Sequence, residues 1–334
     1  RYSVLDESDW STPITISSGD DWFVNWADFP SVVKIGGELW AAHWLAKRPG
    51  GTFAYDVAVS LSHDGGQTWG ESITPHTDNT PTEHGFVSLF PWQDGVGGLW
   101  LDGRNMSGHD NGGMTLRSAV IDTESELAFE HLADEMVCDC CQTDVTVGPE
   151  GPVAVYRNRT EEEIRDIYVM RAIEGKWQPG SPVDEDGWKI AGCPVNGPAI
   201  TSNGEALAVA WFTAADETPK VRFARSADGG VSFENPLDVA ITRPAGRVGV
   251  ALADDGSATV SWLRVGADAK GEIVIRNVSH DGELGEERLI ATTNAGRMSG
   301  FPQLVRDDDN LVLAWTDTLG KITQVRSALL KTSL

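Results

Sequence analysis

The sequence predicts an all-β fold, a six-bladed β-propeller that residues 1–334 form as a single domain. The first observation is a repeat of roughly 45–50 residues along the chain, which is the period expected of propeller blades. The second is that each repeat contains an alternating strand, a tight turn and another strand, and that six copies are present. The third is composition, because 36 Gly and 13 Trp fit many tight turns and aromatic packing between sheets.

The six copies follow one another without a linker. Alternation such as that of residues 206–211 fits strands that neighbouring blades bury on both faces. The sixth copy is followed by one evident strand, at 321–330, so we expect residues 10–17 to add that blade's outer strand and close the ring. In chain order the copies span residues 29–44, 84–104, 143–157, 196–211, 248–262 and 300–315.

Two octapeptides, at 62–69 and 226–233, share the pattern Ser-x-Asp-Gly-Gly-x-Ser/Thr-aromatic and follow alternating runs. We expect each to form a hairpin turn: the Asp carboxylate accepts backbone N–H groups, the glycines adopt positive φ, and the aromatic ring packs back on the sheet. This pattern resembles the Asp-box, or BNR repeat, of sialidases and related propellers. The resemblance implies a sialidase-like propeller whose Asp-box turns lie on the face away from the active site.

Composition and charge argue against several classes of partner. A formal net charge of -24 and a pI near 4.5 are unfavourable for binding nucleic acid or an anionic membrane. No apolar run reaches the length of about 18 residues that a membrane span needs. The chain begins at Arg1, so we expect that a leader or a tag has been removed. With four cysteines the sequence suggests a periplasmic or secreted protein.

The positions of the octapeptide turns predict which face of the propeller carries the site. If the octapeptide turns join third strands to fourth strands, residues just before first strands or just after second strands lie on the opposite face, around a funnel at the axis where propellers bind ligands. We predict catalytic residues and substrate-binding residues there. The catalytic set is Asp28, Asp56, Arg104, Arg157 and Arg247, and the binding set is Trp26, His43, His84, Arg159, Arg165, Asn196 and Asp317.

The arginines predict an anionic ligand, because guanidinium groups bind carboxylates, sulfates and phosphates in a bidentate manner. The alternative is an internal ion-pair lattice of Arg157, Arg159 and Arg165 with Glu163 and Asp166. Both interpretations are open at this point.

The resemblance to sialidases also bears on the catalytic residues. Those enzymes enter the first blade through an aromatic-Arg-Ile-Pro motif, whose Arg helps to bind the carboxylate of sialic acid. In this chain Pro30 matches, but Asp28 stands where that Arg would be, and no Tyr stands in an obvious late-blade position for the family's nucleophile. Glycosidic chemistry needs a proton donor and a second group across the bond. We predict Asp28 and Asp56 for these roles, with turn capping as the alternative.

Histidines and cysteines suggest further chemistry. His43, His84 and Asp28 could form a metal site with two nitrogen ligands and one oxygen ligand, although no cofactor is favoured. Cys140 and Cys193 have the same offset in the third and fourth copies, which predicts a disulfide between them. Cys138–Cys141 could be a second disulfide, with a Cys140–Cys141 bond, a thiolate metal site or a redox-active pair as alternatives.

These observations predict an exported carbohydrate-active enzyme, a glycoside hydrolase acting on an anionic or polyhydroxylated sugar. One alternative is a non-hydrolytic propeller that binds a metal, a ligand or a partner protein through its Cys, His and Asp residues. Another is a polysaccharide lyase, in which a His or Tyr base and an Arg would act on a uronate. The expected partner is a small molecule or carbohydrate, with a protein partner as an alternative; nucleic acid binding and membrane insertion are not expected.

Overall fold

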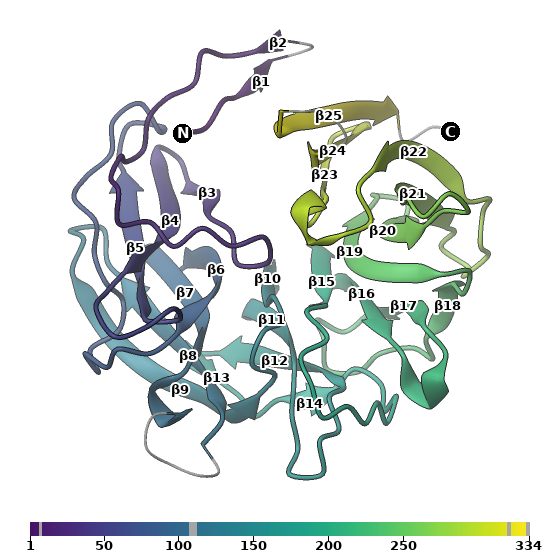
Figure 1. Ribbon diagram of the computed structural model, residues 1–334, viewed down its shortest axis with the longest axis horizontal. Helices are drawn as coiled ribbons and strands as arrows, with labels where there is room; N and C mark the ends of the chain where they lie inside the picture. The colour runs from purple at the N-terminus through teal and green to yellow at the C-terminus, as the bar shows by residue number, and fades with distance from the viewer. Residues whose placement is uncertain (7–8, 107–111, 319–321, 332–334) are drawn as a thin grey trace. The chain divides into compact units, whose positions relative to one another are not determined.

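The computed structural model is all-β, a six-bladed β-propeller, and describes residues 1–6, 9–106, 112–318 and 322–331 (Figure 1). Its contacts divide the chain into two compact units, Arg1–Met136 and Val137–Leu334. The first contains two blades and the second contains four. The single domain over 1–334 therefore stays a prediction. No helix in the described part of the chain is long and apolar enough to cross a membrane.

The first unit holds blades one and two, each built of antiparallel strands in sequence order. Blade one contains β3 (Ser31–Gly36), β4 (Leu39–Lys47) and β5 (Tyr55–Ser62). Blade two contains β6 (His84–Trp92), β7 (Gly95–Asp102), β8 (Met114–Ile121) and β9 (Leu127–Val137).

The second unit holds the other four blades. Blade three contains β10 (Asp144–Gly148), β11 (Gly151–Arg157), β12 (Ile167–Ile173), β13 (Lys176–Trp177) and β14 (Ser181–Pro182). Blade four contains β15 (Ala199–Asn203), β16 (Ala206–Thr213), β17 (Lys220–Ser226) and β18 (Leu237–Ala240). Blade five contains β19 (Pro244–Leu252), β20 (Ala258–Val265), β21 (Gly271–Val278) and β22 (Arg288–Thr293). Blade six contains β23 (Gln303–Asp307), β24 (Asn310–Asp317) and β25 (Gln324–Lys331).

The N-terminal segment differs from its prediction. It was expected to complete blade six, but the described strands of that blade form a three-stranded sheet. Instead, β1 (Leu5–Asp6) pairs with β2 (Asp9–Trp10), and Ile14 pairs with Tyr2. The Tyr2 hydroxyl donates a hydrogen bond to the carbonyl oxygen of Gly66, 2.7 Å away. The Tyr2 ring also contacts the Trp69 ring edge-on, with centroids 6.1 Å apart, so this contact and the hydrogen bond attach the segment to the octapeptide turn of blade one.

Each blade's second strand lies in the apolar core. Trp100 in β7, Trp211 in β16 and Trp262 in β20 are fully buried, which fits the large apolar surface that an indole removes from water. These strands are buried on both faces, as the alternating sequence runs predicted.

The two octapeptide turns have the predicted hydrogen bonds. Asp64 accepts a hydrogen bond from the backbone N–H of Thr68 at 2.9 Å, and Asp228 accepts one from Ser232 at 3.0 Å. Gly66 and Gly230 adopt φ of 87° and 85°, which a side chain would disfavour. The second turn joins β17 to β18, the third and fourth strands of its blade.

Candidate functional site

In the first unit, Asp28, Tyr55 and Glu83 form a hydrogen-bonded chain. The Tyr55 hydroxyl oxygen lies 2.6 Å from Glu83 Oε1 and 3.0 Å from Asp28 Oδ2. Asp28 and Tyr55 are buried, whereas Glu83 is half-buried. Tyr55 is the first residue of β5, and Glu83 immediately precedes β6, so two adjacent blades supply this chain.

A bulge in β6 fixes the other oxygen of Asp28. The register between β6 and β7 shifts between Gly85 and Ser88, and Phe86 in that bulge has a φ of 55°. Its backbone N–H donates a hydrogen bond to Asp28 Oδ1 at 2.8 Å. A bulge redirects a backbone group out of the sheet ladder, which here places an N–H on a buried carboxyl.

The number of protons available to the hydrogen bonds of Asp28, Tyr55 and Glu83 requires that one carboxyl group is protonated. A phenol has one proton, yet both carboxyl oxygens lie within hydrogen-bonding distance of Tyr55. Both contacts are hydrogen bonds only if one acid donates to the phenolic oxygen. Burial raises the pKa of Asp28 to about 7, against the opposing effect of its hydrogen bonds from Phe86 and Tyr55. Asp28 is therefore the acid that keeps its proton near neutral pH.

Tyr55 stays protonated in this environment. Burial first, and then the charges of Asp28 and Glu83, raise the pKa of Tyr55 far above its ordinary value. A phenolate is therefore strongly disfavoured, and the hydroxyl acts as a hydrogen-bond bridge between the two acids.

His84 and His76 form a second cluster in the same unit. Their rings stack in parallel with centroids 3.8 Å apart. His84 Nδ1 lies 3.1 Å from the carbonyl oxygen of Tyr55, and His84 Nε2 lies 3.2 Å from Asp78 Oδ1. Each nitrogen of His84 therefore faces an oxygen atom that can accept a hydrogen bond. His76 Nε2 has no hydrogen-bond partner, and burial followed by the charge of His84 lowers the pKa of His76 to about 4.

Carboxylates surround this pair. Asp56 Oδ1 lies 3.7 Å from a nitrogen of each ring and 3.1 Å from Nη1 of Arg48. Burial raises the pKa of Asp78, but hydrogen bonds from Thr80 and the charges of His84 and Arg104 outweigh it and hold that pKa below its usual range. The predicted catalytic residue Asp56 is thus part of a histidine and arginine cluster.

Three groups of described side chains offer three metal-ligand atoms within 4.8 Å of one another: Cys138, Cys140 and Cys141; Asp56, His76 and His84; and Asp78, His84 and Asp102. The predicted set of His43, His84 and Asp28 is not among them. Its members have other partners, because Asp28 contacts Tyr55 and Phe86, and His43 Nδ1 lies 2.8 Å from Ser31 Oγ.

The stacked histidines are a poor pair of ligands for one ion. An imidazole lone pair lies in the ring plane, and a bound metal lies about 2.0–2.1 Å along it. The planes of His76 and His84 are within 2° of parallel and stack face to face. One ion could not lie in both planes, so this arrangement favours hydrogen bonding over shared coordination.

The predicted arginines all bind acceptors of the protein. Arg104 contacts Asp102 at 2.7 Å and Glu130 at 2.6 Å. Arg157 is buried and donates to the carbonyl oxygens of Asn196, Arg165 and Phe212, and it lies over the Trp188 ring. Arg247 donates to Ser299 Oγ and to the carbonyl oxygens of Gly296 and Gly300.

Part of the ion-pair lattice considered for blade three is present, among Arg159, Arg165 and Glu163, with Asp139 as an additional member. Asp166 instead accepts hydrogen bonds from the backbone N–H groups of Gly187 and Trp188. Arg159 contacts Glu163 and Asp139, at 2.6 and 3.1 Å. Arg165 contacts the same two acids, at 2.8 and 3.5 Å. This geometry supports the structural interpretation of both arginines.

The remaining predicted residues have separate positions. Trp26 is half-buried before β3. Asn196 accepts a hydrogen bond from the backbone N–H of Arg247 at 2.9 Å, which repeats the contact between Asp28 and Phe86. Asp317 lies 2.6 Å from Arg326 Nε.

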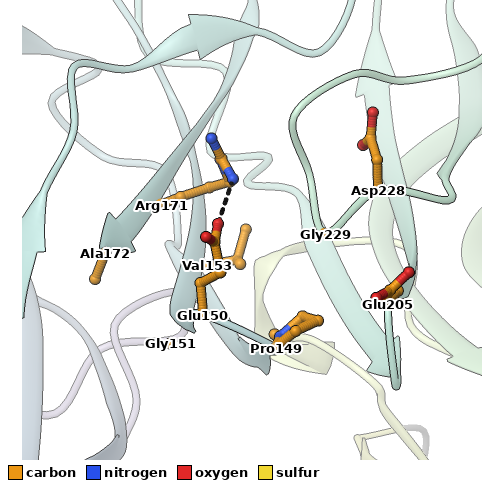
Figure 2. Close-up of a pocket in the computed structure, with 10 residues that line it drawn as sticks. Pro149, Glu150, Gly151, Val153, Arg171, Ala172, Glu205, Asp228 and Gly229 are labelled. Atoms are coloured by element: carbon orange, nitrogen blue, oxygen red, sulfur yellow. Dashed lines mark hydrogen bonds and ion pairs between the residues drawn. The ribbon is translucent and has the colours of Figure 1, made fainter. Parts of the chain in front are cut away.

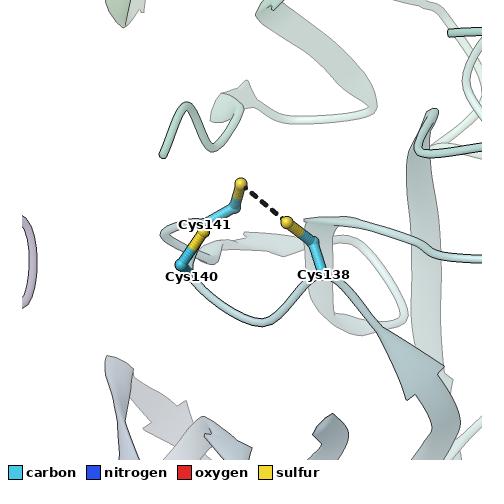
Figure 3. A group of neighbouring side chains, drawn as sticks. All are labelled: Cys138, Cys140 and Cys141. Carbon is cyan, nitrogen blue, oxygen red and sulfur yellow. Dashed lines mark hydrogen bonds between the residues drawn. The ribbon is translucent and has the colours of Figure 1, made fainter. Parts of the chain in front are cut away.

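The cysteines lie between β9 and β10 and before β15. Cys140 and Cys193 form the predicted disulfide. Cys138 and Cys141 are free and buried, with their sulfur atoms 3.0 Å apart (Figure 3). A Cys138–Cys141 disulfide is therefore absent, and the Cys140–Cys141 alternative is wrong because Cys140 is bonded to Cys193.

A pocket of about 340 Å³ lies in the second unit beside the second octapeptide turn. Glu150, Glu205 and Asp228 line it, and its Arg171 is paired with Glu150 at 3.0 Å (Figure 2). None of the predicted site residues lines this pocket.

Sequence reasoning did not assign catalytic roles to Tyr55 and Glu83, and it did not single out His76. Tyr55 is the first residue of the third strand of blade one, and Glu83 immediately precedes the first strand of blade two. These strand-start positions were a usable signal. His76 belongs to the connection between β5 and β6 and has no repeat position to mark it.

No family model matches the chain, and no curated protein matches it. Several solved structures are similar in fold. The BP39L lectin from Burkholderia pseudomallei has a TM-score of 0.66 at 11% identity, covering 99% of this chain and 88% of that one. The GH93 α-L-arabinofuranosidase of Fusarium graminearum has a TM-score of 0.58 at 12% identity, covering 92% and 93%. The leech intramolecular trans-sialidase has a TM-score of 0.57 at 11% identity, covering 95% and 70%. At these identities the chain is similar to a sialidase, a glycosidase and a lectin in fold alone.

Proposed function

We propose that this chain is a carbohydrate-active enzyme, a glycoside hydrolase that acts on a polyhydroxylated sugar through Asp28, Tyr55 and Glu83. The observation that carries the proposal is the chain of hydrogen bonds from a buried acid, through a phenol, to a half-buried acid. A carboxyl group whose pKa is about 7 retains a transferable proton at neutral pH, which is what a general acid requires.

The proposed reaction is hydrolysis of a glycosidic bond. Glu83 is the member of the hydrogen-bonded chain that is open enough to meet substrate. As the bond from the glycosidic oxygen to the anomeric carbon breaks, the Asp28 proton moves to Tyr55, the Tyr55 proton moves to Glu83, and Glu83 delivers it to the glycosidic oxygen in one concerted transfer. Water adds to the anomeric carbon and returns one proton to the chain, so charge and atoms balance.

The substrate class follows from what the arginines contact. An anionic sugar needs guanidinium groups directed at it. The five predicted arginines instead bind carboxylates, hydroxyls and carbonyl oxygens of the protein. This arrangement favours an uncharged polyhydroxylated sugar, and it gives no support to a lyase that neutralises a uronate.

Other features are consistent with this proposal. The Phe23 ring stacks on Tyr55 at 4.0 Å and limits the phenol to one orientation. The similarity in fold to propellers that act on or bind sugars agrees with a carbohydrate ligand. We also propose that the protein is exported, because disulfides such as Cys140–Cys193 persist in oxidising compartments.

The test is hydrolysis of a panel of aryl glycosides that includes neutral pentoses and hexoses, uronic acids and sialic acid. We expect turnover of a neutral member, loss of turnover in Asp28→Asn and Glu83→Gln, and strong reduction in Tyr55→Phe. Glu71→Gln, which changes an exposed acid of the same unit, is the matched control and should keep full activity. Sugar binding without turnover would support the non-hydrolytic alternative. Full activity in Asp28→Asn would overturn the proposed acid.

A further inference from the structure

Three cysteines of the second unit bring a dithiol and a disulfide together. The sulfur atoms of Cys138, Cys140 and Cys141 all lie within 4.8 Å of one another. Cys138 and Cys141, which Figure 3 shows beside Cys140, are buried thiols. Cys140 is bonded to Cys193. Cys193 is exposed. The cluster therefore has a buried reduced pair at one end and a solvent-accessible oxidised pair at the other.

The surroundings of Cys138 stabilise a thiolate. Arg165 Nη1 lies 3.5 Å from its sulfur, and Arg165 is itself fixed by Glu163. The hydrogen bond from Cys141 first, and then the charge of Arg157 and a backbone N–H, lower the pKa of Cys138 to about 6 despite its burial. Burial raises the pKa of the Cys141 thiol well above its ordinary value. One cysteine is therefore the nucleophile, and its neighbour supplies an S–H.

The spacing favours sulfur chemistry over metal binding. Two thiolates on one tetrahedral zinc ion, each at about 2.3 Å from the metal, lie about 3.8 Å apart. The Cys138 and Cys141 sulfur atoms are 3.0 Å apart. This is too close for a shared tetrahedral ion and suits a thiol that donates to a thiolate. The third sulfur of the group is already used in the disulfide.

We propose that Cys138, Cys140, Cys141 and Cys193 form a thiol–disulfide relay, in which the buried pair exchanges two electrons with the Cys140–Cys193 bond and Cys193 exchanges them with an external thiol or disulfide. This activity is independent of the proposed glycoside hydrolysis, because its residues lie in the second unit and the acid–base chain lies in the first.

The internal exchange balances without any further reagent. The Cys138 thiolate attacks Cys140 Sγ, a Cys138–Cys140 bond forms, and the Cys140–Cys193 bond breaks to release the Cys193 thiolate. Cys141 then loses its proton and attacks Cys138 Sγ, which forms the Cys138–Cys141 bond and releases Cys140 as a thiolate. The lost proton passes to the thiolates that have been released. The first pair is oxidised and the second pair is reduced by the same two electrons.

The exposed position of Cys193 defines the class of external partner. The Cys193 thiolate is released at the surface, where a disulfide compound can accept its electrons, and an external thiol can attack the same sulfur in the reverse direction. Cys138 is the attacking residue because Cys141 is directly adjacent to Cys140 in the chain and has the less acidic thiol.

The test uses the folded protein with iodoacetamide and no reductant. Exchange repeatedly frees Cys193, and alkylation then prevents its disulfide from forming again. We expect the wild type to accumulate alkylated Cys193 and a Cys138–Cys141 disulfide. Acid quenching and digestion before aspartate residues, with cleavage at Asp139, separate Cys138 from Cys140 and Cys141 for mass spectrometry.

Two variants distinguish the relay from a static disulfide. Cys138→Ser removes the nucleophile, so alkylation of Cys193 should be lost completely. Cys141→Ser leaves the first step intact, so Cys193 should still be alkylated while a Cys138–Cys140 disulfide accumulates. Melting temperatures of both variants check folding, and Cys141→Ser remains diagnostic if Cys138→Ser does not fold. Unlabelled Cys193 in the folded wild type, or a stoichiometric metal ion bound by the thiols, would overturn the relay.

Discussion

At the residue scale, the chemistry of the Asp28, Tyr55 and Glu83 chain depends on an acid at position 28 where the equivalent position of another blade has an amide. Asp28 and Asn196 both precede a first strand, and each accepts a hydrogen bond from a left-handed residue in the next blade, Phe86 or Arg247. An amide is sufficient for that contact. The acid at position 28 adds a proton that Asn196 does not carry, and Tyr55 connects it to Glu83.

The protonated state of Asp28 makes stability depend on pH. The folded protein holds this proton up to a pH of about 7, whereas the unfolded chain releases it near 3.8. Between these values the folded state binds more protons, so this acid's contribution to the free energy of unfolding falls as pH rises, by up to about 4 kcal/mol in total. Asp28→Asn, which places at this position the residue found at 196, removes that dependence.

We therefore expect the stability of Asp28→Asn relative to the wild type to increase from pH 4 to pH 7 and then level off. Urea unfolding across this range measures the difference. Asp94→Asn, a change at an exposed acid of the same unit, serves as the control and should show no such trend. A pH-independent difference for Asp28→Asn would mean that this carboxyl is already ionised in the folded protein.

At the element scale, the octapeptide turns were predictable because all their interactions are local. Ser62, Asp64 and Thr68 bind one another within a few residues, so spacing alone fixes the hydrogen bonds. The bulges that position Phe86 and Arg247 were not predictable. Neither is a glycine, and their positive φ values are maintained by hydrogen bonds to residues 58 and 51 positions away.

The two turns also differ in what lies over their second glycine. A side chain at Gly66 would meet the Tyr2 ring and Trp40, whereas one at Gly230 would meet the flexible end of Leu207 at 3.0 Å. Both positions have positive φ, which costs a non-glycine residue roughly 1–2 kcal/mol. Gly66→Ala should therefore destabilise by more than Gly230→Ala, and it should also release the N-terminal segment.

Urea unfolding and limited proteolysis near Tyr2 measure these two effects. Gly230→Ala is the matched control, since it has the backbone cost without the collision with Tyr2. Equal destabilisation of the two variants, with the N-terminal segment still protected, would show that Tyr2 does not pack against Gly66 in solution.

At the scale of the whole molecule, the repeat identified the blades, while pairwise contacts decided the site. Periodicity specifies which strands form a blade, because each copy has the same alternating pattern. It does not specify the partner of a given side chain. Arg157 was predicted to be catalytic from its position at the end of a second strand, but its guanidinium is buried against three carbonyl oxygens. Such contacts depend on loops that the repeat does not constrain, as does the stacking of His76 on His84.

The net charge of -24 leads to a prediction for the complete chain. It comes from 50 acidic and 26 basic residues, and many of the basic groups are already paired, as Arg222 is with Asp184 and Asp238. The excess acids repel one another more in the compact state than in the unfolded chain. Salt at about 0.5 M reduces the Debye length well below the value of about 10 Å at 0.1 M and weakens this repulsion.

We expect the melting temperature to rise steadily from low salt to about 0.5 M NaCl, because screening relieves more repulsion than it removes attraction from the exposed pairs. Sucrose at equal osmolality controls for general solute effects. A melting temperature that falls with NaCl would instead show that attractive ion pairs dominate the electrostatic free energy of folding.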